Sequence, residues 1–295
     1  MDNRSSRSGG NSLYSSEMSA ERKQRHTIKN ADLSILTEWF RANGDSAVVA
    51  LSGGVDSAVV ALAAAKAFGT RAVAITADYK TLASEELAAA KRVANEIGID
   101  HRIIQYSELD NPEFVKNDSM RCYYCRSELG THLRAEAQKE GIDLVVDGTN
   151  ADDLKDYRPG IKALRENGIR SPLAELGVSK QQVRNIAHRF GLSVHDRPSN
   201  ACLASRIPRG VPVTFEKLKR IEDAEVMAKS MLGVRQLRVR DHGEIARIEV
   251  ATDEMTKLFD VAKLAILNTK LKELGFRFVS FDAGGYRTGN LVVID

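Results

Sequence analysis

A glycine-rich loop and three cysteines are the features of this 295-residue chain whose residue types and spacing suit chemistry. The loop reads Ser52-Gly53-Gly54-Val55-Asp56-Ser57 and stands between a short apolar run and an alanine-rich segment. That order predicts a strand, a glycine turn and a helix. Glycine lets the backbone approach an anion closely, and a helix N-terminus offers free N–H groups and the positive end of its dipole. We therefore predict that the loop binds phosphate.

The loop differs from two common phosphate-binding motifs. No lysine follows the glycines, as a Walker loop requires, and the Gly-x-Gly-x-x-Gly dinucleotide fingerprint is absent. The loop resembles the PP-loop of the ATP pyrophosphatase (adenine nucleotide α-hydrolase-like) superfamily, against the alternative of an ordinary glycine-rich turn. The resemblance implies that ATP is cleaved between its α- and β-phosphates to activate a carbonyl or carboxyl oxygen. Ser52, Gly53, Gly54, Asp56 and Ser57 would then contact ATP.

Polar residues also follow other predicted strands. Asp78 stands where the superfamily contacts adenosine, and Gly148-Thr149 leads into Asp152 and Asp153. Ligands of parallel sheets bind beyond the carboxyl ends of the strands, so we expect these residues beside the loop. Adjacent carboxylates suit Mg²⁺, although capping a helix is their alternative role. Arg170 is a candidate for gripping phosphate with its guanidinium, or is simply solvated at the surface.

The elements that must position these residues alternate between strand and helix. The strands are nearly all apolar, as expected for strands covered on both faces, and the alternation predicts a parallel, doubly wound α/β sheet of the PP-loop type. We predict strands over 47–51, 71–76, 102–106 and 144–147, and helices over 31–43, 57–68, 84–97 and 126–141.

A smaller α+β domain follows a break near residue 206. Its pattern predicts helices over 215–232 and 253–275 and strands over 236–239, 245–251 and 278–282. We place a PP-loop ATP pyrophosphatase domain at 31–206 and a C-terminal substrate or oligomerisation domain at 207–295. Residues 1–30 are rich in Ser, Arg, Asn and Gly and bury too little apolar surface to offset ordering, so we predict a disordered tail.

Composition narrows the class of protein. Lys plus Arg numbers 43 against 40 for Asp plus Glu, and this net charge of +3 does not by itself predict a nucleic-acid partner. No apolar run approaches the roughly 20 residues of a membrane span. Three cysteines in a chain of this length do not form a disulfide scaffold, so we expect a reducing, cytoplasmic location.

The cysteines allow several interpretations. Cys122 and Cys125 form a Cys-Tyr-Tyr-Cys motif, and Cys202 lies far along the chain. A redox dithiol would use only the first pair. A structural zinc site would need a histidine as well, and Cys202 alone could be a small buried hydrophobe. Three soft thiolates could instead hold an iron–sulfur cluster with one iron left open.

Four stretches together resemble the LarE family, from about residue 30 to the C-terminus. They are Ser52–Ser57, Asp147–Asp153, Pro198–Arg206 and Gly285–Gly289. The resemblance implies an AMP-forming sulfurtransferase that converts the carboxylates of pyridinium-3,5-biscarboxylic acid mononucleotide to thiocarboxylates. The product serves the nickel-pincer nucleotide cofactor of lactate racemase and related racemases and epimerases. The implied cofactors are ATP and Mg²⁺.

The resemblance also bears on the source of the sulfur. In the single-cysteine form of the family, the cysteine that Cys202 matches gives up its own sulfur. Cys122 and Cys125 depart from that form and match a three-cysteine type, similar to cluster-dependent tRNA thiolation enzymes. There a [4Fe-4S] cluster on three cysteines carries sulfide. We therefore expect Cys122, Cys125 and Cys202 to be catalytic cluster ligands, supplied by sulfide or another sulfur donor.

The anionic substrate needs basic residues, for which Arg206, Arg238 and Arg240 are candidates. Arg238 and Arg240 are two apart on a predicted strand and share a face, although that face could simply be solvated. A tRNA thiolase is one competing function, but the chain has no strong basic stripe. An ammonia-using ligase is another, and it leaves the cysteines without a role. The family resemblance further implies a homo-oligomer assembled through the C-terminal domain.

Overall fold

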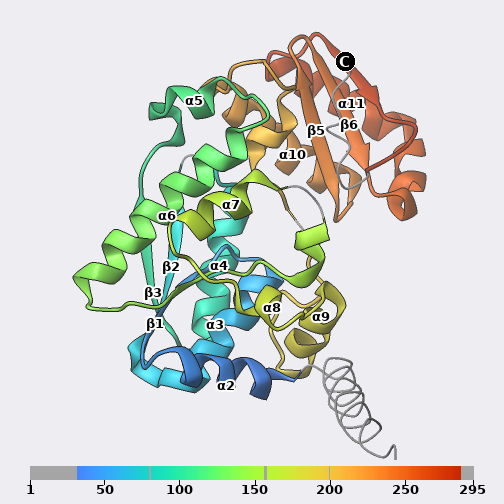
Figure 1. Cartoon of the computed structure of the whole chain (residues 1–295). Helices are drawn as coiled ribbons and strands as arrows, with labels where there is room; N and C mark the ends of the chain where they lie inside the picture. Colours follow the sequence, from blue (N-terminus) through green and yellow to red (C-terminus); the bar gives the residue numbers. More distant parts are fainter. Residues whose placement is uncertain (1–31, 80, 156–157, 199, 287–295) are drawn as a thin grey trace, which may run out of the picture.

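The structure is a computed structural model that describes residues 32–79, 81–155, 158–198 and 200–286. The predicted tail of residues 1–30 lies outside these ranges, as do residues 287–289 of the C-terminal motif. Figure 1 shows a larger α/β part, coloured blue to yellow, and a smaller part, coloured orange to red.

The larger part is built on a four-stranded sheet in the order β3-β2-β1-β4, and all its strands are parallel. The strands are β1 (Ala47–Ala50), β2 (Ala72–Asp78), β3 (Asp100–Gln105) and β4 (Val145–Val146). An isolated parallel bridge between Val146 and Arg170 extends the sheet beyond β4. This topology confirms the predicted α/β sheet.

Helices cover both faces of this sheet. They are α2 (Leu33–Asn43), α3 (Val55–Phe68), α4 (Ser84–Ile97), α6 (Arg121–Lys139), α7 (Pro159–Glu166) and α9 (Lys180–Arg189), with short α5 (Pro112–Val115) and α8 (Pro172–Glu175). One core joins the sheet to α2, α3, α4 and α9. A second core joins its other face to α6 and α7, as expected for near-continuous apolar strands.

The helix predicted over 126–141 begins earlier, at Arg121. A turn sets this start, in which the N–H of Met120 donates to Asp118 Oδ1 at 2.7 Å and the N–H of Arg121 to the Asp118 carbonyl at 3.2 Å. The intervening Cys and Tyr residues have modest helix propensity, which hides the start in the sequence. Cys122 and Cys125 consequently lie three residues apart on one helix.

The smaller part has the predicted order of elements, with one correction. Its elements are α10 (Phe215–Leu232), β5 (Leu237–His242), β6 (Ile245–Val250), α11 (Val261–Glu273) and β7 (Phe278–Phe281). The predicted helix over 253–275 is instead a 3₁₀ helix, Thr252–Phe259, followed by α11. The Asp260 side chain accepts from the N–H of Lys263 at 3.1 Å and so caps a new helix there.

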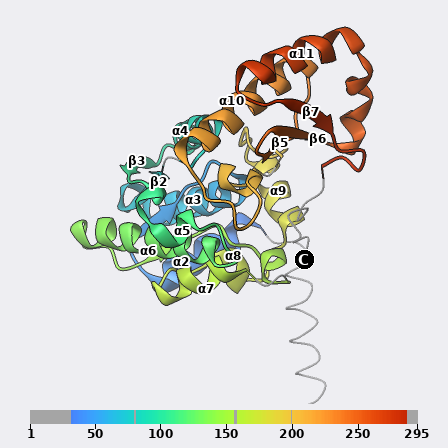
Figure 2. The ribbon, with the colours of Figure 1, turned by 90° about the horizontal axis from the view of Figure 1, so that it is seen from above.

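The sheet of the smaller part runs in the order β5-β6-β7, antiparallel between β5 and β6 and parallel between β6 and β7. Figure 2 shows α10 and α11 on one face of this sheet, where a separate apolar core joins them to it. The opposite face of β5 is therefore left for contact with the larger part.

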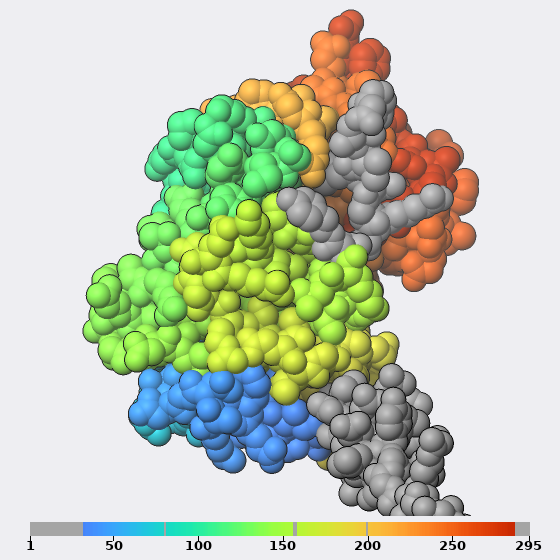
Figure 3. Space-filling view, in the orientation of Figure 1, coloured from blue at the N-terminus to red at the C-terminus, as the bar shows by residue number. Residues whose placement is uncertain are grey.

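The two parts share an apolar cluster where they meet. It includes Ala83 and Phe114 of the larger part, Leu203 of the connection, and Leu218 and Ile221 of α10. Backbone bonds add to it, because the N–H of Val213 donates to the carbonyl of Val115 at 3.0 Å. The space-filling view shows the green and orange surfaces in contact at this junction (Figure 3). No helix in the described ranges has the length and apolar character to cross a membrane.

Candidate active site

The glycine-rich loop is held by its own serines. Ser57 Oγ accepts from the N–H of Ser52 at 3.1 Å and donates to the carbonyl of Gly54 at 3.0 Å. The Ser52 hydroxyl lies 3.1 Å from the same Oγ. Gly54 is the N-cap of α3 and offers no side-chain cap, so the first N–H groups of the helix meet no capping side chain. The loop and the start of α3 therefore form a suitable binding site for phosphate, called the phosphate seat below.

The loop depends on glycine at 53 and on Gly148 beside it. Gly53 has φ 77°, and a Cβ there would lie 2.5 Å from the carbonyl oxygen of Glu86 on α4. At Gly54 the nearest atom to such a Cβ is Ser52 Oγ, at 3.5 Å. A Cβ on Gly148 would lie 2.6 Å from the Ser57 nitrogen. The later polar segment therefore packs directly on the start of α3, as the sequence predicts.

Two side chains contact the carboxylate of Asp56. Asn150 Nδ2 donates to Asp56 Oδ1 at 3.1 Å, and Lys180 Nζ forms an ion pair with Oδ2. The N–H of Lys180 also donates to Asp152 Oδ2 at 2.8 Å. Lys180 opens α9, whose N-cap Ser179 forms a capping box. Sequence reasoning missed Lys180 because it belongs to no motif and lies far from Asp56 along the chain.

Asp152 and Asp153, the predicted magnesium ligands, lie beside the loop but already have partners. Asp152 pairs with Lys155 at 2.7 Å, and hydrogen bonds from the Lys155 side chain and the Lys180 N–H lower the pKa of the Asp152 carboxyl. Asp153 accepts from the N–H of Asn150 at 3.1 Å and pairs with Arg158. Within the described ranges, no group of three or more His, Cys, Asp or Glu side chains is placed to hold a metal ion. Magnesium binding stays a prediction.

The remaining nucleotide candidates lie at the ends of strands. Asp78 ends β2, and Gln105 donates to it at 3.4 Å. Thr149 donates its hydroxyl to the buried Asp147, which also accepts from Ser171 at 2.6 Å. Asp78 and Asp147 therefore lie at the carboxyl ends of the two strands that flank β1, the edge where ligands of such sheets bind.

Arg170 has a different set of contacts from those predicted. Its guanidinium donates to Glu175 Oε1 at 3.1 Å and to Asn43 Oδ1 at 2.6 Å, and it lies 4.5 Å from the Trp39 ring centroid. These contacts tie α2 to α8. The guanidinium of Arg170 is already hydrogen-bonded within the protein, so the structure adds no support to a role in binding phosphate.

The fold brings Cys202 to the helix that carries the other two cysteines. Cys122 is exposed, whereas Cys125 and Cys202 are partly buried in the cluster at the junction. The Cys202 thiol donates to Thr81 Oγ1 at 3.5 Å. Burial, and then the nearby Glu108 carboxylate, raise the pKa of both the Cys125 and Cys202 thiols. The two thiols lie within electrostatic range of each other.

Glu108 is a functional candidate that the sequence did not single out. Its residue is fully buried, Oε2 accepts from the Thr81 hydroxyl, and Oε1 has no hydrogen-bond partner among the described residues. Burial raises the pKa of Glu108 to about 7, against the lowering effect of contacts with Cys125 and Thr81. A buried carboxyl that can hold its proton therefore lies beside two of the thiols.

Arg206 is fully buried and holds the stretch that carries Cys202. It donates to both carboxylate oxygens of Glu225 of α10, at 2.8 and 3.0 Å, and to the carbonyls of Ala201 at 2.5 Å and Cys202 at 3.0 Å. It also donates to Asn200 Oδ1 at 3.0 Å. A guanidinium has five N–H donors, and these contacts engage them. In this structure Arg206 positions Cys202, and the predicted contact with substrate stays a prediction.

Arg238 and Arg240 lie on the face of β5 that is opposite to its apolar core, as their spacing predicts. Arg240 donates to the carbonyl of Ser205 at 3.0 Å and pairs with Glu249 at 2.7 Å. Arg238 lies over Tyr286, 5.2 Å from the ring centroid. Burial and the charge of Arg206 lower the pKa of Arg238. The face is buried at the junction rather than solvated.

Arg197 connects the loop to the Cys202 stretch. It donates to the carbonyl of Gly53 at 3.1 Å and to both carboxylate oxygens of Glu86 at 2.9 and 2.8 Å. Asn200 donates to the same carboxylate at 2.8 Å and accepts from Arg206. A continuous chain of hydrogen bonds therefore runs from the phosphate seat to the residues that hold Cys202.

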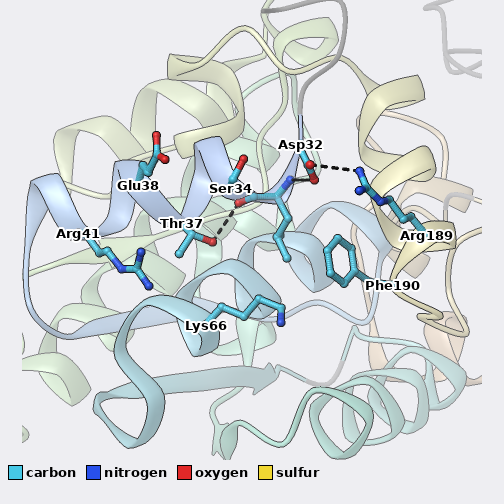
Figure 4. Close-up of a pocket in the computed structure, with 9 residues that line it drawn as sticks. Asp32, Ser34, Thr37, Glu38, Arg41, Lys66, Arg189 and Phe190 are labelled. Carbon is cyan, nitrogen blue, oxygen red and sulfur yellow. Dashed lines mark hydrogen bonds and ion pairs between the residues drawn. The ribbon is translucent and has the colours of Figure 1, made fainter.

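A surface hollow of about 440 Å³ lies elsewhere and is not part of this site. Figure 4 shows it between α2, Lys66 and the Arg189–Phe190 end of α9, with Arg189 paired to Asp32. Lys66 belongs to the last turn of α3, whereas the loop leads into the first. The hollow is lined by no residue of the loop and by no cysteine.

Comparisons with known proteins fit this geometry. A family model described as asparagine synthase matches residues 44–171. An uncharacterized protein of Synechocystis sp. is 44% identical over 247 residues, covering 84% of this chain and 92% of that protein. The pyridinium-3,5-bisthiocarboxylic acid mononucleotide synthase of Lactiplantibacillus plantarum is 33% identical over 244 residues, covering 82% and 87%. An uncharacterized protein of Methanocaldococcus jannaschii is 30% identical over 241 residues, covering 82% and 90%.

Proposed function

Since this chain belongs to the LarE family of PP-loop, ATP-using enzymes, we propose that it is an AMP-forming sulfurtransferase that acts on pyridinium-3,5-biscarboxylic acid mononucleotide. It would convert the two carboxylates to thiocarboxylates for a nickel-pincer nucleotide cofactor. One observation carries this proposal: the hydrogen-bond chain through Arg197 and Asn200 joins the phosphate seat to the cysteine stretch. Activation and sulfur transfer can thus share one site.

In the first step the loop binds the ATP phosphates, and Asp56 or Asp152 would hold a magnesium ion that offsets their charge. A substrate carboxylate attacks the α-phosphate, and pyrophosphate leaves. The N–H groups at the start of α3 and the loop hydroxyls stabilise charge that develops on the phosphates. Lys180 pairs with Asp56 and adds positive charge beside the start of α3. The product is an acyl-adenylate whose AMP is a good leaving group.

In the second step sulfur replaces AMP on the acyl carbon. Cys125 and Cys202 pack against the same apolar cluster, and Cys122 precedes Cys125 by one turn of α6. Three thiols are the soft donor set that an iron–sulfur cluster takes, and Cys122 is exposed, but among the described residues the three do not form a group placed to hold a metal ion. Cys122, Cys125 and Cys202 would hold such a cluster, which would supply the sulfide. Arg206 and Thr81 orient Cys202.

The smaller domain would bind the anionic substrate. Arg238 and Arg240 face the Cys202 stretch, and their charges suit its phosphate and carboxylates. A small-molecule substrate is also consistent with the chain's modest net charge of +3. These residues would bring the carboxylates to the loop in turn.

Exchange of labelled pyrophosphate into ATP tests the proposal. We expect exchange that depends on the dicarboxylate mononucleotide, because only a bound carboxylate can take AMP. A Cys202→Ala variant should keep this exchange and lose thiocarboxylate formation. Exchange that needs tRNA, or AMP release that needs ammonia, would contradict the proposed substrate or the proposed chemistry.

A further inference from the structure

Arg126 occupies a fixed position between α6 and α7. It follows Cys125 directly and lies one helical turn after Cys122, on the same side of α6. A Cβ built on Gly160 of α7 would lie 2.9 Å from Arg126 Cγ and 3.1 Å from the carbonyl oxygen of Cys122. The absence of a side chain at Gly160 therefore makes room for the stem of Arg126. The residue itself is exposed.

The groups that act electrostatically on Arg126 belong both to the nucleotide segment and to the region around the cysteines. Although part of the side chain reaches solvent, desolvation by the surrounding protein lowers the pKa of the guanidinium. The thiol of Cys125, the hydroxyl of Tyr79 and the carboxylate of Asp147 outweigh this effect and raise the pKa. Asp147 stands directly before Gly148, which packs on the start of α3. Groups from the nucleotide segment and from the cysteine helix therefore both act electrostatically on this guanidinium.

Arg126 differs from the other arginines of α6 in having no partner among the described residues. Arg121 donates to Asn117 Oδ1 at 2.5 Å and to the carbonyl of Ala204 at 2.8 Å. Arg134 donates to the carbonyls of Asn167 at 3.0 Å and Asp143 at 2.7 Å. No hydrogen bond or ion pair holds the guanidinium of Arg126 within the described ranges. Its planar fork can therefore accept an anionic ligand.

We propose that Arg126 is a catalytic residue that binds the phosphate of the adenylated carboxylate while sulfur displaces AMP, an inference that rests on the proposed function. Hydrosulfide attacks the acyl carbon, a C–S bond forms, and the C–O bond to AMP breaks. The electron pair leaves on the phosphate oxygen, and the proton of hydrosulfide passes to solvent. No oxidant or reductant is needed. Arg126 stabilises the charge that grows on the departing phosphate.

Two variants separate this role from nucleotide binding. Arg126→Met keeps the bulk of the stem and removes the charge, whereas Arg126→Lys keeps the charge and loses the fork. Loss of one such donor typically costs about 100-fold or more in rate. We expect Arg126→Met to retain dicarboxylate-dependent pyrophosphate exchange within about threefold and to form thiocarboxylate about 100-fold more slowly. Arg126→Lys should recover part of that loss.

The control is Lys139→Met, which removes an exposed cation from the last turn of the same helix. It should leave both rates unchanged. The inference is overturned if exchange and thiocarboxylate formation fall together in Arg126→Met, or if neither falls. Absence of exchange in the wild-type protein would instead overturn the proposed function, so the two failures are distinguishable. Melting temperatures equal to that of the wild-type protein check that each variant remains folded.

Discussion

The thiols of Cys125 and Cys202 share a buried carboxyl group, that of Glu108. Such a group costs free energy when it ionises, because one of its oxygens lacks a partner among the described residues. Its pKa of about 7 means that it holds a proton in the folded protein where the unfolded chain, with an ordinary value of 4.5, has lost it. Stability from this group is therefore complete below pH 4.5 and is lost as the pH rises through 7.

Glu108→Gln should remove this pH dependence. Relative to wild type, the free energy of unfolding of the variant should rise between pH 5 and 8 by up to about 3 kcal/mol, since glutamine has no proton to lose. Urea unfolding at both pH values measures the difference. If the free energies of unfolding of variant and wild type differ by the same amount at pH 5 and pH 8, Glu108 does not ionise abnormally.

Individual site residues were predictable where a local motif carried them. The loop Ser52–Ser57 forms a strand–turn–helix as expected, because its glycines and flanking apolar residues act locally. Lys180 belongs to no such motif and reaches Asp56 only through tertiary packing. Arg206 was predicted to contact substrate, but its partner Glu225 comes from the other domain, and no periodicity in the sequence reveals that pair.

At the scale of elements, glycine at 53 decides how β1, the loop and α3 sit on α4. Its positive φ is unfavourable for other residues, and the space where a Cβ would point holds the backbone of α4. Gly54 has neither constraint. The two neighbouring glycines therefore have different structural roles, although both belong to the same motif.

Gly53→Ala should destabilise the protein by more than about 1–2 kcal/mol, the cost of a left-handed conformation alone, and should abolish nucleotide binding. Gly54→Ala is the matched control, and we expect it to retain the fold because only Ser52 Oγ lies within 4 Å of the new methyl group. Thermal unfolding and ATP titration of both variants provide the measurement. Equal losses in the two variants would contradict this assignment.

Element boundaries were predictable where patterns and caps agree. Helix α10 has the predicted bounds, with Thr214 capping its start and Gly233 in the left-handed conformation at its end. The start of α6 was hidden by weak helix formers. The split before α11 was hidden because the apolar spacing runs on through residue 260, where only the Asp260 cap marks a new start.

At the scale of the whole molecule, the Cys202 stretch is held by both domains. Arg206 is fully buried and Glu225 is almost so, and their ion pair crosses the predicted boundary at residues 206–207. Removal of one partner from a buried ion pair leaves an uncompensated charge. The position of Cys202 therefore depends on the smaller domain, and no split of the chain at this boundary should preserve the site.

Glu225→Ala should lower the free energy of unfolding by about 3–5 kcal/mol and should increase the rate at which iodoacetamide alkylates Cys202. Glu273→Ala is the control, because its pair with Lys270 is about half exposed on both sides and should contribute about 0–1 kcal/mol. Urea unfolding and peptide mass mapping give the two readouts. An unchanged alkylation rate in Glu225→Ala would contradict the role of the pair in placing Cys202.

The mass of the nucleotide product tests the central claim, that an activated carboxylate receives sulfur in this site. The full chain would be incubated without oxygen with ATP, Mg²⁺, sulfide and pyridinium-3,5-biscarboxylic acid mononucleotide. The account predicts products in which sulfur replaces one and then two carboxylate oxygens, with one AMP and one pyrophosphate released for each replacement. Release of AMP with an unchanged or amidated nucleotide would contradict it.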